Sequence, residues 1–98
     1  MSQFRLTPAA QRDLSAIWDY TERNWGPNQA EVYLRQIQRT LELVSERNEF
    51  GRRRPDINRA YRSIPSGRHV IFYKCSNGAI EVIRILHQRM DPLRHLDS

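Results

Sequence analysis

The chain has 98 residues and a mass of 11.7 kDa, which suffices for one hydrophobic core but not for several domains. We therefore expect a single domain over residues 1–98. No apolar run approaches the roughly 20 residues of a membrane-spanning helix, so no membrane association is expected. The first residues lack the apolar stretch of a signal peptide, which favours an intracellular protein. The single cysteine, Cys75, excludes an internal disulfide and a cysteine-based zinc site.

The charge indicates what kind of partner the protein has. The net charge is +5 and the pI is near 10.1. Of the 16 basic residues, 15 are arginine and only Lys74 is lysine. Guanidinium stays ionised and binds carboxylate or phosphate through two parallel hydrogen bonds. We expect an anionic partner, either nucleic acid or an acidic polypeptide. A GC-rich genome would explain the arginine-to-lysine ratio equally well, but it would not explain the net charge.

The chain opens with a strand and a helix. Residues 4–6 alternate apolar and polar side chains, which predicts a short strand. Thr7 can cap free backbone N–H groups, and Pro8 loses nothing at the first helical position, so a helix is predicted to begin here. Apolar residues then recur at steps of three and four until Gly26 and Pro27 end the helix.

A second amphipathic helix is predicted over residues 27–47. Asn28 and Glu31 have the spacing of a capping box at its start. The connection between the two helices is very short, so they should form an antiparallel hairpin. Trp18 and Trp25 lie on the apolar face of the first helix, and we expect both to pack in the core.

Beyond the helices, the hydrophobic period changes from 3.6 to 2. Residues 48–60 are predicted to be a loop that carries the run Arg52, Arg53 and Arg54. Three strands are then predicted, at residues 61–65, 68–75 and 79–86. Asn77 and Gly78 indicate a hairpin turn, because both tolerate positive φ. The last strand is almost continuously apolar, so we expect it to be central and covered on both faces.

The predicted order is therefore β-α-α-β-β-β. This order indicates an α+β fold with a helical hairpin packed on one face of a small antiparallel sheet. The N-terminal strand must join that sheet or remain unpaired. Residues 87–98 are predicted to be a polar C-terminal tail of the same domain.

Most kinds of catalytic or cofactor site are disfavoured. All four glycines stand alone at predicted turns, so no nucleotide-binding loop is present. His69, His87 and His95 lack tight ligand spacing, so no metal and no other cofactor is expected. No serine has the strand-to-helix context of a nucleophile elbow.

RNA cleavage is the enzymatic possibility that the residues allow. It needs a base, an acid and cations on the phosphate. His87 could be the acid, because its ordinary pKa lies near neutrality, and Glu46 or Glu49 could be the base. The arginines that could hold phosphate are Arg62, Arg68 and Arg84. A simpler interpretation is that the glutamates are exposed residues near a helix end and that His87 closes a strand.

A series of short stretches has a characteristic order and spacing. They lie at residues 6–14, 17–20, 25–26, 29–31, 33, 51–52, 61–62, 66–69, 71–73 and 80–91. Together they resemble the ParE-type toxins of the RelE/ParE toxin–antitoxin superfamily, over nearly the whole chain. The most specific part is His-Gln-Arg-Met-Asp at residues 87–91.

The resemblance implies a bacterial cytoplasmic toxin with the fold predicted above. It implies a ParD-like antitoxin, a toxin–antitoxin hetero-oligomer and no sequence-specific DNA binding by the toxin alone. ParE-like members poison DNA gyrase without catalysis, whereas RelE-like members cut messenger RNA on the ribosome with a set of lysines and arginines. This chain has only Lys74, which favours the gyrase alternative. His87 could match the terminal acid of the RNA-cutting members and keeps that alternative open, whereas Arg62 and Arg84 match arginines of both branches.

Three sets of site residues follow as expectations. The expected contacts with the target are Arg68, His87, Gln88, Arg89 and Arg94. The expected contacts with the antitoxin are Arg35, Arg39, Arg52, Arg53, Arg62 and Arg84. If the protein is a nuclease instead, the catalytic set is His87, Arg62, Arg84 and Glu49.

Overall fold

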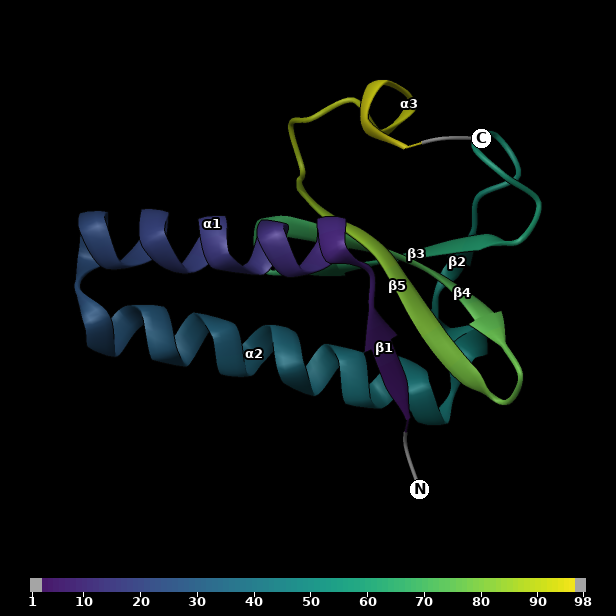
Figure 1. The fold of residues 1–98 in the computed structure, drawn as a ribbon, viewed down its shortest axis with the longest axis horizontal. Helices are drawn as coiled ribbons and strands as arrows, with labels where there is room; N and C mark the ends of the chain where they lie inside the picture. The colour runs from purple at the N-terminus through teal and green to yellow at the C-terminus, as the bar shows by residue number, and fades with distance from the viewer. Residues whose placement is uncertain (1–2, 97–98) are drawn as a thin grey trace.

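The computed structural model describes residues 3–96, and the outermost two positions at each end of the predicted 1–98 domain lie outside the described residues. Its elements, in chain order, are β1 (Phe4–Leu6), α1 (Pro8–Trp25), α2 (Pro27–Glu46), the short 3-10 turn η1 (Asn48–Phe50), β2 (Arg52–Arg53), β3 (Tyr61–Ser66), β4 (His69–Ser76), β5 (Ala79–His87) and α3 (Pro92–His95). Figure 1 shows the two long helices side by side against one face of the sheet. The predicted β-α-α-β-β-β order is confirmed, with β2 and α3 as additions. Between residues 3 and 96, no helix is both long and apolar enough to cross a membrane.

The helical hairpin begins and turns at the predicted residues. Oγ1 of Thr7 accepts the N–H of Ala10 at 3.0 Å and donates to the carbonyl of Ile83 at 2.8 Å, so one side chain caps α1 and ties it to β5. Gly26, at φ +91°, separates the two helices. The predicted capping box at Asn28 and Glu31 is wrong, because α2 begins one residue after Gly26, which has no side chain to cap it.

The sheet is mixed. Its strand order is β1-β5-β4-β3-β2, with β1 parallel to β5 and the other pairs antiparallel. The N-terminal strand therefore joins the sheet, and β5 becomes an internal strand covered on both faces, as expected. Phe72 pairs with Arg84 and Tyr73 pairs with Val82, so Ile83 is an extra residue and forms a β-bulge.

Two hydrophobic clusters lie on opposite faces of this sheet. The first contains residues of both long helices packed on side chains such as Ile71, Tyr73 and Ile85. The second contains Phe72 and Leu86. Neighbouring residues of a strand point to opposite faces, so the second cluster lies on the face away from the helices. It is closed by Ile57 and Tyr61 around the arginine-rich loop and by Leu96 near the C-terminus.

Three expectations need correction. Trp25 is 58% exposed and is not a core residue, because it lies at the tip of the hairpin, which projects beyond the sheet in Figure 1. The predicted loop over residues 48–60 contains η1 and β2, since Arg52 and Arg53 pair with β3. The predicted polar tail contains α3 and the buried Leu96.

Tyr73 and Gly51 make the tightest contact between the core and the loop region. The fully buried ring of Tyr73 places its hydroxyl 2.6 Å from the carbonyl oxygen of Asn48, to which it donates. Burial raises the pKa of Tyr73, so the hydroxyl keeps the proton that makes this bond. A Cβ at Gly51 would overlap this hydroxyl and would lie 2.6 Å from Cζ of the ring.

This contact predicts that Gly51→Ala destabilises the fold. We expect the free energy of unfolding to fall by about 1–3 kcal/mol, because the buried ring has no room to move away. Urea denaturation of Gly51→Ala in the wild-type and Tyr73→Phe backgrounds measures the effect. The decrease should be smaller in the Tyr73→Phe background, where the overlapping oxygen is gone. Equal decreases in both backgrounds would show that the hydroxyl is not the obstacle.

Candidate functional site

A groove of about 690 Å³ lies between the helical hairpin and the ends of β4 and β5. Its apolar side comes from the second half of α1, including Ile17, Tyr20 and Trp25, and from Met90 after β5. Its polar end comes from the β3–β4 turn and the last residue of β5. The groove is thus apolar along the helices and basic or aromatic at the end of the sheet.

The apolar side of the groove exposes two large aromatic rings. Tyr20 is 59% exposed and Trp25 is 58% exposed. Their rings meet edge-on, with centroids 5.9 Å apart and planes at 62°. The apolar face of α1 continues beyond the sheet. Both rings lie on this part of the helix, where no strand of residues 3–96 covers them. Exposed aromatic area of this kind is typical of a contact surface.

Tyr33 organises the polar end of the groove. Its hydroxyl lies 2.6 Å from Nδ1 of His69 and accepts the backbone N–H of Arg68 at 3.0 Å. The carbonyl of Ser66 is 3.4 Å away. Nδ1 of His69 accepts the hydroxyl proton when it is unprotonated, and in the other tautomer it donates its own proton to the hydroxyl oxygen.

The surroundings of His69 disfavour its protonated form. Burial lowers the pKa of His69, and the neighbouring His87 lowers it further, while Asp13 acts in the opposite direction. The two imidazole rings meet edge-on with centroids 5.3 Å apart. A proton on His69 would therefore be opposed by desolvation and, when His87 is charged, by repulsion.

The structure brings four of the five expected target contacts together. Gln88 donates its N–H to the carbonyl of Arg68 at 2.8 Å, and Arg89 donates its N–H to Nδ1 of His87 at 3.1 Å. Arg94 lies on α3, where its side chain forms a long ion pair of 3.9 Å with Asp91. The role of these residues at a target remains a prediction.

Arg62 and Arg84 are both engaged inside the molecule. Nη1 of Arg62 donates to the carbonyl of Gly51 at 2.8 Å. Arg84 forms a two-pronged ion pair with Asp13. Arg62 pairs in register with Tyr73 and Arg84 with Phe72, so the two arginines lie on opposite faces of the sheet. They are not placed to hold the same phosphate.

The expected nuclease residues do not converge on one point. His87 pairs with His69, whereas Arg62 pairs with Tyr73, four residues further along β4. At ~3.3 Å per residue this separates them by about 13 Å along the strand. Glu49 lies in η1, at the Arg62 end. An acid, a base and a phosphate-holding cation must all reach one phosphodiester, and this arrangement does not provide that.

The expected antitoxin contacts fall on two other surfaces. Arg35 and Arg39 are exposed on α2, where Arg35 pairs with Glu31 at 2.6 Å. Arg52 and Arg53 are exposed on β2, the edge strand of the sheet. Their neighbour Arg54 differs, because it pairs with Asp56 at 2.9 Å and lies over the ring of Phe72. The hydrogen bond from Arg54 lowers the pKa of Asp56.

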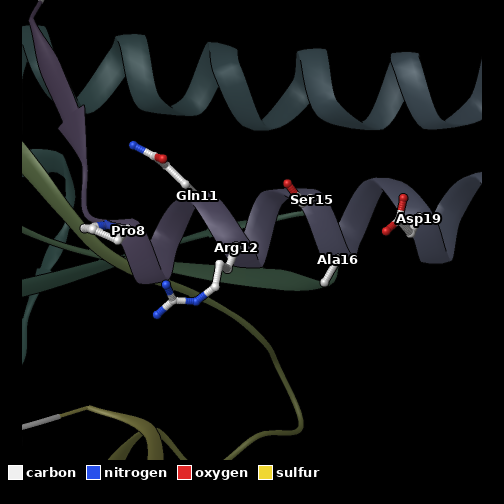
Figure 2. A pocket seen from close by; sticks show the side chains of 6 residues that line it. All are labelled: Pro8, Gln11, Arg12, Ser15, Ala16 and Asp19. Carbon is white, nitrogen blue, oxygen red and sulfur yellow. The ribbon is translucent and has the colours of Figure 1, made fainter.

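A second, shallow depression lies on the outer side of α1. Figure 2 shows its lining side chains spreading along the helix in different directions rather than converging. The depression has a volume of about 480 Å³ and is lined by Pro8, Gln11, Arg12, Ser15, Ala16 and Asp19. Within residues 3–96, no group of three His, Cys, Asp or Glu side chains is placed to hold a metal ion.

The sequence prediction missed Asp13, Tyr33, Tyr20 and Met90 as groove residues. The partners of Asp13 and Tyr33 lie in β-strands far along the chain, at Arg84 and His69. All four lie within the stretches that carry the family resemblance, but the resemblance gave none of them a role. Tertiary contact was needed to find them.

The lowered pKa predicts that His69 makes stability depend on pH. The unfolded chain binds this proton at its ordinary pKa of about 6.5, more readily than the folded chain does. The free energy of unfolding should therefore fall as the pH drops below about 6.5 and level off below the folded-state pKa. Denaturant titrations between pH 7.5 and 5.5 measure this, and His69→Gln should flatten the profile whereas the exposed His95→Gln should not. An unchanged slope in His69→Gln would contradict the assignment.

A family model, two similar proteins and a solved structure all relate this chain to ParE toxins or ParDE systems. The family described as "ParE toxin of type II toxin-antitoxin system, parDE" matches residues 4–92. Toxin ParE1 of Mycobacterium tuberculosis is 43% identical over 96 residues, covering 97% of this chain and 98% of the relative. Toxin ParE1 of Caulobacter vibrioides is 40% identical over 96 residues, covering 98% of this chain and 99% of the relative.

A solved structure shares the fold. The chain described as "Chromosomal ParDE TA system from P. aeruginosa" aligns with a TM-score of 0.75 at 21% identity, covering 89% of this chain and 96% of that one. At this identity the likeness concerns the fold alone, whereas the family match and the two toxins extend over nearly the full length. The chain therefore belongs to the ParE family of toxins of type II toxin–antitoxin systems.

Proposed function

We propose that this ParE-family toxin stops growth by binding DNA gyrase in the bacterial cytoplasm, and that a ParD-like antitoxin neutralises it. The observation that carries the proposal is the groove at the end of the sheet. Exposed Tyr20 and Trp25 supply apolar contact area there, and Arg68 supplies positive charge. Aromatic and arginine side chains side by side are the residue types that dominate protein–protein contact energies.

The arrangement supports action by contact rather than by cleavage. The residues that a nuclease would need are divided between the two ends and the two faces of the sheet. Arg84 is neutralised by Asp13, so it offers little net charge to a phosphate. Surface contact needs no such convergence, because each residue of an interface contributes at its own position.

The antitoxin is proposed to be acidic and to meet exposed arginines of the toxin. Arg52 and Arg53 form no salt bridge within residues 3–96, and they lie at an open sheet edge. Arg35 and Arg39 extend the positive charge on α2. The toxin and antitoxin would form a hetero-oligomer, and the toxin alone is not proposed to bind specific DNA sequences.

The gyrase proposal predicts that the purified chain inhibits DNA supercoiling and causes cleaved DNA to accumulate. Arg68→Ala should weaken the inhibition at least about tenfold, since truncating a hot-spot arginine costs about 2 kcal/mol or more. A plasmid supercoiling assay over a range of toxin concentrations measures both effects.

Arg12→Ala is the matched control, because Arg12 is an exposed arginine on the outer depression of α1 in Figure 2. This variant should inhibit as strongly as the wild type. The proposal fails if micromolar wild-type toxin neither inhibits supercoiling nor increases DNA cleavage. Cutting of messenger RNA at defined positions by the pure chain and ribosomes would support the nuclease alternative instead.

The antitoxin proposal predicts that association slows as salt is added. Exposed ion pairs are screened over about 10 Å at 0.1 M salt, so they steer encounter but add little affinity each. Stopped-flow association with the antitoxin at 50 and 500 mM salt (the two values roughly bracketing the screened regime) measures this dependence. Arg52→Ala combined with Arg53→Ala should reduce it. An association rate that does not change with salt would count against an acidic antitoxin.

A further inference from the structure

One ion pair joins three parts of the chain that are far apart in the sequence. Nε of Arg84 donates to Oδ2 of Asp13 at 2.8 Å, and Nη2 donates to Oδ1 at 2.9 Å. Nη1 of the same guanidinium donates to the carbonyl oxygen of His95 at 3.1 Å. The Asp13–Arg84 pair therefore links α1, β5 and the end of α3.

This pair is largely withdrawn from water and well satisfied. The side chain of Asp13 is 14% exposed and that of Arg84 is 25% exposed. Oδ2 of Asp13 also accepts the backbone N–H of Ile85 at 2.9 Å. The hydrogen bond with Asp13 raises the pKa of Arg84 above its ordinary value, which favours the charged guanidinium. Removing one partner leaves a partly buried charge unpaired, which costs more than losing an exposed pair.

The C-terminal segment, residues 88–96, depends on few other contacts. α3 has four residues, which is too short to be stable as an isolated helix. Asp91 caps it by accepting the N–H of Leu93 at 3.0 Å. The first residues of the segment, 88–90, donate their N–H groups to Arg68 and His87. Its end is fixed by buried Leu96 and by the carbonyl of His95, which Arg84 binds.

We propose that Asp13 and Arg84 are positioning residues that hold the C-terminal segment on the domain and so present Arg89 and Arg94 to the target. The part that concerns the target rests on the proposed function, whereas the docking of the segment is testable by itself. Arg84 then acts within the toxin, in place of the antitoxin contact expected from the sequence. Asp13, to which the sequence analysis gave no role, becomes as important for the segment as Arg84.

Hydrogen exchange of the full chain, followed by mass spectrometry, tests the docking. In Asp13→Asn, amides of residues 88–96 should exchange at least about tenfold faster. The free energy needed to open this segment locally is lower in the variant, while the core stays closed. Leu96→Ala should also speed exchange of residues 88–96, because it removes the apolar contact of the segment while the ion pair stays intact. Arg84→Lys keeps the charge but not the three simultaneous bonds, so its effect should be intermediate. Unchanged exchange in Asp13→Asn and Arg84→Lys would overturn the proposal.

Two binding measurements separate positioning from other roles. Asp13→Asn and Leu96→Ala should both weaken gyrase inhibition, while their affinity for the antitoxin stays within about twofold of the wild type, as expected for sites that share no contact. Weaker antitoxin binding by Arg84→Lys together with normal binding by Asp13→Asn would show that Arg84 contacts the antitoxin, and would overturn the proposal.

The remaining outcomes are also distinguishable. Faster exchange of residues 88–96 with undiminished gyrase inhibition would overturn the positioning role. If the wild-type chain does not inhibit gyrase at all, the proposed function fails, and the exchange experiment still decides whether the ion pair holds the segment.

Discussion

A sheet with two buried faces is the constraint on which the rest of this small fold depends. β4 sends Ile71 and Tyr73 to one face and Phe72 to the other. The helical hairpin covers only the first face, and a chain of 98 residues has few others left to cover the second. The loop around Ile57 and the end of the chain at Leu96 do so. Leu96 is therefore a core residue, although most of the segment that carries it is exposed.

The same constraint explains why the groove exists. The hairpin must be long enough to bury its central residues on the sheet, and its apolar stripe continues to Tyr20 and Trp25 at the projecting tip. The sheet ends before them, at the turn that carries Arg68. Apolar area without a tertiary partner and positive charge thus come to lie next to each other. A second protein that covers this groove would gain the hydrophobic burial that the fold itself leaves unused.

The helix ends and turns could be predicted from the sequence, because residues next to one another in the chain determine them. Thr7 and Gly26 marked the ends of α1, and the turn at Asn77 and Gly78 has the positive φ values that those residues favour. Periodicity placed Trp25 on the correct helix face but could not show where the sheet stops, so its burial was predicted wrongly. The strand β2 was missed because two arginines carry no alternating pattern.

The site was less predictable than the fold, because its key contacts join distant positions. Asp13 and Arg84 are 71 residues apart, and Tyr33 and His69 are 36 residues apart. Patterns at i, i+3 and i, i+4 reveal which helical residues share a face, but they contain no information on which strand will lie opposite. Among the expected target contacts, Arg68 directly precedes β4 and His87 is the last residue of β5. These two strand ends lie side by side because His69 pairs with His87.

Arginine has two distinct uses in this chain, which composition could not separate. Arg84 binds two carboxylate oxygens and a carbonyl at once, and Arg54 binds Asp56 while lying over Phe72. A lysine ammonium cannot make either set of contacts, because it lacks the planar fork. At these positions the structure uses the shape of the guanidinium group as well as its charge. The charge that a partner can meet lies instead on exposed residues such as Arg52 and Arg68. Salt should therefore weaken encounter with a partner much more than it weakens the fold, since partly buried pairs are screened less than exposed ones.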